Sequence, residues 1–538
     1  MSENPSPPRS PLAVVILAAG LGTRMKSDIP KVLHEVCGRP MLAYVIDAAL
    51  SVSPSRIVVV TGAEQDAIAD ALPVGCERAL QAERRGTGDA VRAGLEPLEG
   101  FDGDVVVLVG DAPLVDGLFL ESLVEAHRAA GARATVATAV LGEPVHYGRV
   151  VRGPAGGVAR IVEARDAGPD ELRLNEVNTG FYVFDAGLLR AVLPRLQPAN
   201  VQGELYLTDA VHLALADGDR VDAYVAEEPE VMLAINSRVE LAEVNALMRR
   251  RLLERLMLAG VTVEDPATTY VDWGVEVGRD TVLRANTHLL GRTTVGAASE
   301  VGPGAYLRDA FVGDRARVVA SQLHDCVVGS RCTVGPYAYI RPNTVLAEGA
   351  WAGTFVEIKN SRIGEGSKVP HLSYVGDATV GTGSNIAAGN ITANFDGEQK
   401  HPTHIGDDVH TGSDTTFVAP VTVGDGAYTA AGSVITQDVP PGALAVARAR
   451  QQTIPGYTER RAARRLAEQA AAEQGAVAGA RGGDARPPDE APDEAPVEAR
   501  QWGESSGADA STPGPADVTA PGDEDCLLYT SPSPRDRG

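Results

Sequence analysis

The chain has few of the residues that cross-link a protein or anchor it in a membrane. Only five of its 538 residues are cysteines, and none forms a Cys-x-x-Cys pair. This usage predicts a reducing compartment with neither a disulfide framework nor a structural zinc site. No apolar run is long enough to span a membrane, and the polar, proline-rich residues 1–10 lack the apolar core of a signal peptide. We therefore expect a cytoplasmic protein without membrane insertion.

Positive charge and aromatic residues are also scarce. The chain has 48 Lys and Arg against 72 Asp and Glu, a net charge of −24, which argues against a nucleic-acid surface. A small anionic substrate is not excluded, because its site needs only a few local cations. Aromatics make up 4% whereas glycines number 58, which suits an α/β domain joined to short strands and tight turns. The length allows two or three domains.

The sequence pattern changes along the chain. Residues 11–236 alternate valine-rich apolar runs with helical patterns, the βαβ pattern of a parallel or mixed sheet. Residues 237–260 repeat apolar residues at near-helical spacing and predict a linker helix. Residues 458–538 begin with a charged helix, expected at 460–474, and continue as a tail too poor in apolar residues to order. Its last part, 526–538, resembles a translated adapter and is not treated as native.

Residues 261–457 carry an aliphatic residue at every sixth position over long stretches. One run reads Val334, Ile340, Leu346, Ala352 and Ile358. This period is the signature of a parallel β-helix, in which three hexads make a coil and stacked coils bury the aliphatic column. A polar loop at 392–404 interrupts the hexads, and such insertions often carry function.

The strongest chemical motif is the glycine-rich turn Leu17-Ala18-Ala19-Gly20-Leu21-Gly22-Thr23-Arg24-Met25, followed by Pro30-Lys31. Backbone N–H groups of such a turn point at an anion, and Arg24 and Lys31 add charge for a phosphoryl transition state. A bare Gly-x-Gly is usually a plain strand–turn–helix connection, but the added Thr-Arg-Met and Pro-Lys favour a phosphate site. The spacing excludes a dinucleotide fingerprint and a Walker loop.

Asp111 is the best metal ligand that the pattern offers. It follows the apolar run 104–109, at the edge where ligands bind in open α/β sheets. A carboxylate suits Mg²⁺. An Asp in this place also often caps the next helix, so the residue alone leaves both roles open.

Over residues 12 to about 455 the chain resembles the bacterial bifunctional N-acetylglucosamine-1-phosphate uridylyltransferases/glucosamine-1-phosphate N-acetyltransferases. Residues 17–34 match the sugar nucleotidylyltransferase signature, and 368–377 read Lys-Val-Pro-His-Leu-Ser-Tyr-Val-Gly-Asp in a solenoid like those of hexapeptide-repeat acyltransferases. The resemblance implies an α/β nucleotidylyltransferase (Rossmann-like) domain, a linking helix and a left-handed parallel β-helix that assembles a homotrimer. A disordered acidic tail completes the expected fold.

The implied reactions are acetyl transfer from acetyl-CoA to glucosamine 1-phosphate, then uridylyl transfer from UTP to N-acetylglucosamine 1-phosphate. The product, UDP-N-acetylglucosamine, is a precursor of peptidoglycan and, in Gram-negative envelopes, of lipid A. The resemblance places Mg²⁺ on Asp111 and Asn236 and the phosphate charge on Arg24 and Lys31. Residues implied to bind UTP or its sugar product are Leu17, Ala18, Ala19, Gly20, Lys31, Gln81, Gly86, Thr87, Gly148, Glu163, Asn178 and Asn236. The amide of Gln81 can read a donor and an acceptor on uracil.

In the solenoid the resemblance makes His371 the proton acceptor, because imidazole titrates near the working pH. A lone His on a solenoid is otherwise more often a surface or interface residue. Glu357 is a weaker candidate to orient the imidazole. Glucosamine 1-phosphate is expected at Arg341, Lys359, Tyr374 and Asn385. Acetyl-CoA is expected at Ala388, Asn394, Phe395, Ser413, Ala431 and Arg448.

Three positions depart from the family pattern without removing a catalytic group. Asp89 stands where relatives commonly have His, Phe395 where they have Tyr, and Ala387 where they have Gly. Two other functions stay open: a single-activity sugar-phosphate nucleotidylyltransferase whose β-helix serves oligomerisation, and an architectural solenoid. The Lys-x-x-His-x-x-Tyr segment with Arg341 and Lys359 argues against the first, and Gly-x-Gly-Thr-Arg-Met against the second.

Overall fold

The computed structural model describes residues 10–142, 147–154 and 156–479. They divide into a compact unit that ends at Arg450 and a second unit beyond it. The second unit contains the helix α8 (Tyr457–Gly479), which extends past the predicted range 460–474. The tail expected to be disordered and the adapter-like residues 526–538 lie outside the described residues. The boundaries at 236, 260 and 457 stay predictions.

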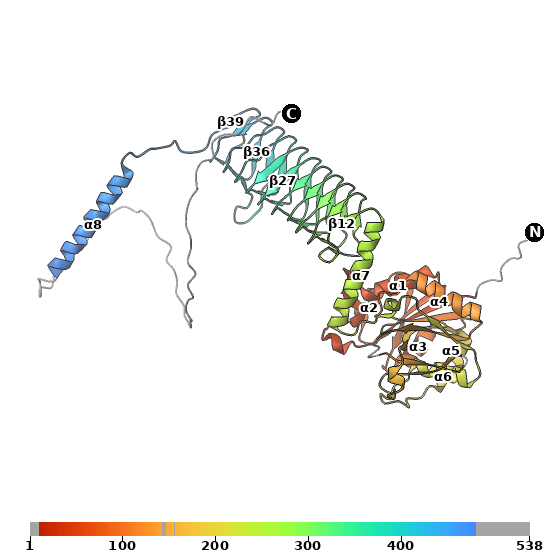
Figure 1. Cartoon of the computed structure of the whole chain (residues 1–538). Helices are drawn as coiled ribbons and strands as arrows, with labels where there is room; N and C mark the ends of the chain where they lie inside the picture. Colours follow the sequence, from red (N-terminus) through yellow and green to blue (C-terminus); the bar gives the residue numbers. More distant parts are fainter. Residues whose placement is uncertain (1–9, 143–146, 155, 480–538) are drawn as a thin grey trace, which may run out of the picture. The chain divides into compact units, whose positions relative to one another are not determined.

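The first part of the chain folds into a mixed sheet, as its valine-rich runs predicted (Figure 1). Its strands are β1 (Leu12–Leu17), β4 (Arg56–Gly62), β5 (Cys76–Gln81), β6 (Asp104–Val109), β7 (Ala134–Val140), β8 (Arg149–Arg152), β9 (Val158–Val162), β10 (Glu176–Asp185) and β11 (Val221–Val225). The order is β11-β7-β10-β6-β1-β4-β5, and β8 and β9 extend the sheet beside β10. Only β10 runs antiparallel to its neighbours β6 and β7 on that path.

Helices cover both faces of this sheet. They are α1 (Met41–Ser51), α2 (Asp66–Asp70), α3 (Thr87–Leu95), α4 (Gly117–Ala130), α5 (Ala186–Val192) and α6 (Leu207–Ala216). Val14 and Ile16 of β1 pack toward α1 and α4, whereas Ala13 and Val15 pack toward α3, α5 and α6. Because β1 is buried on both sides, the carboxyl ends of the central strands are the place left for a ligand.

The predicted linker helix is α7 (Arg238–Leu258), and it ends before Gly260, whose φ is +97°. Ser237 caps its start by accepting a hydrogen bond from the N–H of Glu240. Its apolar residues Val244, Met248, Leu252 and Leu256 are buried, which explains their near-helical spacing.

The hexads form a parallel β-helix with three faces (Figure 1). The first face consists of β12 (Thr262–Val263), β15 (Val282–Leu283), β18 (Glu300–Val301), β21 (Arg317–Val318), β24 (Thr333–Val334), β27 (Trp351–Thr354) and β30 (Lys368–His371). The second consists of β13 (Tyr270–Val271), β16 (His288–Leu290), β19 (Tyr306–Arg308), β22 (Gln322–His324), β25 (Tyr339–Ile340), β28 (Glu357–Lys359), β31 (Tyr374–Gly376), β33 (Ile391–Ala393), β35 (Thr416–Val418) and β38 (Val434–Ile435). The third consists of β14 (Glu276–Val277), β17 (Thr294–Val295), β20 (Phe311–Val312), β23 (Cys326–Val328), β26 (Thr344–Leu346), β29 (Arg362–Ile363), β32 (Ala378–Val380), β34 (Thr403–Ile405) and β36 (Val421–Val423). A last pair, β37 (Tyr428–Thr429) and β39 (Leu444–Ala445), closes the stack.

The register confirms the repeat. Val301, Val318, Val334, Ala352 and Val369 stack directly upon one another along the first face, each buried and one coil beyond the last. The coil between β32 and β34 carries the polar loop that interrupts the hexads. No helix among the described residues is long and apolar enough to cross a membrane.

Candidate functional site

A cavity of about 460 Å³ opens where the glycine-rich turn meets the carboxyl ends of β5 and β6. The structure brings most of the predicted nucleotide-binding residues into its lining. They are Leu17, Ala18, Ala19, Gly20, Lys31, Gln81, Gly86, Thr87 and Asp111. The cavity therefore assembles residues from distant parts of the sequence into one concave site.

Lys31 and Asp111 of this cavity meet a third predicted residue, Asn236, which is not in the cavity lining. Lys31 Nζ donates to the carboxylate of Asp111 and, at 3.1 Å, to Asn236 Oδ1. The side chains of Lys31 and Asp111 are only 12% and 14% exposed. The backbone N–H of Ile235 donates to Asp111 O at 2.9 Å, and Glu240 accepts from the N–H of Asn236 at 2.7 Å. These two hydrogen bonds fix the main chain of Asp111 and Asn236.

The donor set of Asp111 and Asn236 fits Mg²⁺. Both offer the oxygen ligands that this ion prefers, and Mg²⁺ commonly takes its remaining ligands from phosphates and water. No group of three or more His, Cys, Asp or Glu that could hold a metal occurs among the described residues. A two-residue oxygen site that relies on a triphosphate is consistent with that finding.

Two glycines of this region are required by geometry. Gly22 has φ +63°, and a Cβ there would lie 2.6 Å from Lys31 Cβ. Gly86 has φ +114°, and a Cβ there would lie 2.6 Å from Leu205 O. Gly22 therefore gives Lys31 the space to reach Asp111. Gly86 brings the N-terminus of α3 to the cavity, where its N–H groups favour an anion.

The residues expected around the sugar ring also lie together. Gly148 O accepts from the N–H of Asn178 at 2.9 Å, and a Cβ on Gly148 would lie 3.3 Å from Glu163 Oε2. Asn178 Nδ2 donates to Tyr182 Oη at 2.7 Å. Burial raises the pKa of Glu163, although the hydroxyl of Thr208 donates to it at 3.4 Å. These side chains form a polar cluster suited to hydroxyl groups.

The lining of this cavity differs from the sequence prediction at two arginines. Arg24 lies exposed in the short 3₁₀ helix Thr23–Met25 and does not line the cavity, so its catalytic role stays a prediction. Arg84 lines the cavity and donates from Nε to Ala19 O at 2.8 Å, yet sequence reasoning missed it. Its position in a loop after Gln81 gave no signal beyond a pair of basic residues.

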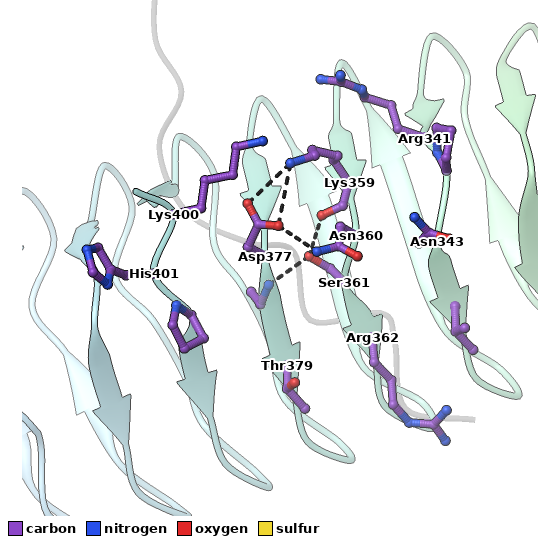
Figure 2. Close-up of a pocket in the computed structure, with 14 residues that line it drawn as sticks. Arg341, Asn343, Lys359, Asn360, Ser361, Arg362, Asp377, Thr379, Lys400 and His401 are labelled. Carbon is purple, nitrogen blue, oxygen red and sulfur yellow. Dashed lines mark hydrogen bonds and ion pairs between the residues drawn. The ribbon is translucent and has the colours of Figure 1, made fainter. Parts of the chain in front are cut away.

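A second cavity, of about 890 Å³, lies on the outside of the β-helix and includes the predicted cations Arg341 and Lys359 (Figure 2). Lys359 Nζ lies 3.3 Å from the carboxylate of Asp377. Burial acts to raise the pKa of Asp377, but hydrogen bonds from Asn360, Asn394 and Lys359 outweigh it and hold the pKa below the ordinary value. Asp377 is therefore held in its ionised form, and it pairs with Lys359 at the cavity wall.

Lys400, from the polar loop, is a cation of this cavity that sequence reasoning missed. Figure 2 shows it beside Asp377, extending toward Lys359. The nearby ammonium of Lys359 lowers the pKa of Lys400, because two positive charges repel. A cluster of cations with one carboxylate is suited to a phosphate group.

Three of the residues predicted for the sugar phosphate lie on or directly after strands of the second face, namely Arg341, Lys359 and Tyr374. A Cβ on Gly376 would collide with Tyr374 Oη, so the phenol lies along the strand over that glycine. Arg341 Nη1 donates to Glu357 Oε1 at 2.6 Å. Glu357 makes no hydrogen bond with His371 among the described residues, and its role in orienting the imidazole stays a prediction.

His371 ends β30 with an exposed side chain, at the corner between the first and second faces. Its backbone O accepts from the N–H of Gly389 at 3.3 Å, so the same corner of the next coil stacks on it. Asn385, also predicted for the sugar, lies in that next coil, where it bridges Lys368 and His410 by backbone pairing.

Predicted acetyl-CoA residues continue this corner column. Ala388 O accepts from the N–H of Asp414 at 2.8 Å, and Ser413 O accepts from the N–H of Gly432 at 2.8 Å. Ala388, Ser413 and Ala431 therefore occupy the same corner in successive coils beyond His371. At a strand spacing of about 4.8 Å, three coils span roughly 14 Å. The column offers an extended track along the solenoid edge.

The remaining acetyl-CoA residues are more scattered. Asn394 donates its side-chain amide to Asp377 and so belongs to the 890 Å³ cavity region. Phe395 is 59% exposed in the polar loop, and Arg448 is exposed just beyond β39. In a single chain the structure does not join these two residues to the corner column.

Large apolar side chains project from the same corner of the solenoid at Leu372 and in the coils that precede it. Tyr337, Phe355 and Leu372 have φ of +60°, +56° and +48° and are each more than half exposed. The rings of Tyr337 and Phe355 stack with centroids 5.4 Å apart. Positive φ is costly for bulky residues, and exposed apolar columns mark interaction surfaces. This corner is suited to a second copy.

Comparisons with known proteins match both the α/β part and the β-helix part of the chain. A family described as "MobA-like NTP transferase domain" matches residues 14–169, and "Bacterial transferase hexapeptide (six repeats)" matches 402–437. A "Bifunctional protein GlmU" of Mycolicibacterium vanbaalenii is 49% identical over 457 residues, 84% of this chain and 93% of its own length. Proteins of the same name are 50% identical in Streptomyces avermitilis and 46% in Corynebacterium glutamicum, each over 84% of this chain and at least 94% of their own.

Proposed function

Because the chain belongs to the GlmU family of bifunctional proteins, we propose that its two sites divide two successive steps of UDP-N-acetylglucosamine synthesis. The enzyme is a glucosamine-1-phosphate N-acetyltransferase that uses acetyl-CoA, and a Mg²⁺-dependent uridylyltransferase that uses UTP. The α/β domain carries the nucleotidyl transfer and the β-helix the acetyl transfer. The N-acetylglucosamine 1-phosphate made on the β-helix is the acceptor in the first domain.

The convergence of Lys31, Asp111 and Asn236 supports the uridylyltransferase assignment. An oxygen of the sugar phosphate attacks the α-phosphorus of UTP in line, and diphosphate leaves. Such a transfer depends on positioning and on neutralising phosphate charge. Asp111 and Asn236 would hold Mg²⁺, which would neutralise part of the phosphate charge. Lys31 adds a second cation, with the triphosphate as its alternative acceptor, and Arg24 is proposed to add a third.

Substrate positioning falls to the rest of this cavity. Gln81 holds the uracil, while the turn Leu17 to Gly20 and the start of α3 at Thr87 line the path of the phosphates. The cluster of Gly148, Glu163 and Asn178 holds the N-acetylglucosamine ring. Its buried carboxyl and amides can satisfy the sugar's hydroxyl groups.

On the β-helix, the arrangement of Arg341, Lys359 and His371 supports the acetyltransferase assignment. The two cations lie where the strands of the second face end, and His371 lies at the corner where these strands begin. Arg341 and Lys359 hold the phosphate of glucosamine 1-phosphate, and Tyr374 and Asn385 contact its ring. His371 takes a proton from the substrate ammonium. The freed amine attacks the thioester carbonyl, the C–S bond breaks, and CoA leaves as a thiol or thiolate along the corner column.

We further propose a homotrimer formed through the β-helix. The exposed corner of Tyr337, Phe355 and Leu372 is the apolar surface that another copy would cover. A neighbouring chain would also enclose the acetyl-CoA track, which lies open at the solenoid edge in one chain. The proposed compartment is the cytoplasm, where UTP and acetyl-CoA are both supplied.

Two assays on one preparation test these assignments. Thiol release from acetyl-CoA with glucosamine 1-phosphate and diphosphate release from UTP with N-acetylglucosamine 1-phosphate are both expected. Diphosphate release without thiol release would support the single-activity alternative, in which the β-helix only oligomerises. Sedimentation equilibrium on the same sample checks the trimer.

A further inference from the structure

Asp89 is a buried carboxylate to which the proposed reaction gives no role. It lies in the first turn of α3, is 7% exposed and does not line the 460 Å³ cavity. Its Oδ1 pairs with Arg92, which is on the outer side of the helix and half exposed. Burial of a carboxylate is costly unless its oxygens accept hydrogen bonds. The hydrogen bond that the second oxygen, Oδ2, accepts therefore indicates the role of Asp89.

Asp89 Oδ2 accepts from Nε2 of Gln81 at 3.0 Å. The same Nε2 donates to Gly86 O at 3.1 Å. Gln81 is 4% exposed, and both hydrogens of its amide are directed to these two protein acceptors. A flipped amide would place Oε1 against a carboxylate and a carbonyl, two contacts between acceptors. Asp89 and Gly86 together fix the orientation of the Gln81 amide.

With its hydrogens used, Gln81 has only Oε1 left for a ligand. Oε1 accepts no hydrogen bond from the described residues, and Gln81 lines the nucleotide cavity. The sequence suggested that this amide could read a donor and an acceptor, whereas the structure leaves one acceptor. Uracil presents an N–H donor at N3, but cytosine presents a lone pair there. A fixed acceptor facing N3 bonds the first base and repels the second.

We propose that Asp89 is a positioning residue that sets the base specificity of the enzyme. By fixing the Gln81 amide it makes the site accept a uracil nucleotide and reject a cytosine nucleotide. This inference rests on the proposed placement of UTP at Gln81. Asp89 does not touch the substrate, so it affects discrimination between bases more than the chemical step.

The test compares kcat/KM for UTP and CTP, with N-acetylglucosamine 1-phosphate and Mg²⁺, in the full-length enzyme. Asp89→Asn is isosteric and can donate as well as accept, so it permits the flipped amide. We expect the preference for UTP over CTP to fall at least about tenfold. The loss should come from a higher KM for UTP and a gain with CTP, while kcat at saturating UTP changes by less than about threefold. Asp89→Glu, which keeps an acceptor, should retain more of the preference.

Arg92→Gln is the matched control, because it removes the ion pair on α3 but leaves the bond from Gln81 to Asp89. It should keep the wild-type preference, and kcat at saturating UTP in the Asp89 and Arg92 variants reports correct folding of the α/β domain. An unchanged preference in Asp89→Asn would overturn the inference, as would an equal loss in Arg92→Gln. Gln81→Ala separates the premise from the inference: if it too keeps the preference, the placement of uracil at Gln81 is wrong.

Discussion

The two sites of this enzyme differ in how complete they are within one chain. The proposed uridylyltransferase site is a cavity inside a domain, where Lys31 already balances Asp111 and both are largely buried. The proposed acetyltransferase groups lie on the outer surface of a solenoid, where Arg341 pairs with Glu357 and Lys359 with Asp377. An internal cavity can be finished by its own fold, whereas a solenoid face depends on a neighbour to exclude water.

The largest expected effect is the loss of one activity without the other. Asp111→Asn weakens the oxygen site for Mg²⁺ and should lower UDP-N-acetylglucosamine formation about a thousandfold. His371→Ala removes the proton acceptor and should lower acetyl transfer by about 10²–10⁴-fold. Each variant should keep the other activity near the wild-type level in the paired assays. Substantial uridylyl transfer by Asp111→Asn, or acetyl transfer above a few per cent in His371→Ala, would contradict the assignments.

A methyl group at Gly22 should damage only the first site. Gly22→Ala forces a side chain to φ +63° and against Lys31, so the ammonium is displaced from its position. A misplacement of this size should reduce kcat for uridylyl transfer roughly a hundredfold. Gly131→Ala is the matched control, because Gly131 has φ +59° but a Cβ there meets nothing within 4 Å. Equal losses in both variants would argue against displacement of Lys31 as the cause.

A charge on the exposed corner should damage only the second site. Phe355→Asp keeps a residue that tolerates positive φ but places a carboxylate where another copy is proposed to pack. We expect dissociation of the trimer and about a tenfold loss of acetyl transfer, with uridylyl transfer retained. Sedimentation velocity and the two assays measure this. Val74→Asp, at a fully exposed position in the first domain, should change neither.

If Phe355→Asp lost acetyl transfer while the trimer persisted, the corner would contribute to the site itself and not to assembly. If the trimer dissociated and acetyl transfer were unchanged, one solenoid face would suffice for catalysis. Either result would mean that the acetyltransferase site does not depend on a neighbouring chain in the way proposed.

The smallest effect concerns two carboxyl groups, Asp377 and Glu163, whose pKa values are shifted in opposite directions by folding. The folded pKa of Asp377 is lowered, so its contribution to stability is complete above the unfolded value and is lost as the pH falls through the folded value. Asp377→Asn should therefore cost about 1–2 kcal/mol at neutral pH and progressively less in acid. Thermal unfolding across a pH series measures this.

Glu163 should show the reverse sign. Burial raises its folded pKa, so the stability linked to its protonated form is present below the unfolded value and is lost as the pH rises through the folded value. Glu163→Gln should raise the Tm at neutral pH by a degree or two, and this gain should vanish in acid. A uniform shift at every pH would mean that packing, not ionisation, causes the change.

Sequence patterns were sufficient where one physical requirement repeats or where a motif is dense. The hexads must point inward in every coil, so the six-residue spacing alone assigns Val334 and Ala352 to a buried column. The turn around Gly20 and Lys31 likewise lines a cavity, where the phosphate site stays a prediction. Long-range side-chain partners were beyond this reasoning. Lys400 and Arg84 reach their cavities from loops, and the pairing of Glu357 with Arg341 depends on stacking between coils.

The same limit explains Gln81. From sequence its amide had two donor hydrogens and an acceptor available. Only the fold shows that Asp89, in the first turn of α3, and Gly86 use both hydrogens. What a side chain offers a ligand is decided by the hydrogen bonds that the protein has already made with it.

The corner column that begins at His371 can change in length only by whole coils of the solenoid. Each coil adds one step of about 4.8 Å to the track through Ala388, Ser413 and Ala431, without altering the corner at His371, the proposed proton acceptor. A solenoid can thus gain or lose a coil and change its reach in fixed increments. The distance from the reacting thioester to the far end of its carrier would then be counted in repeats, a kind of ruler that a globular pocket cannot provide.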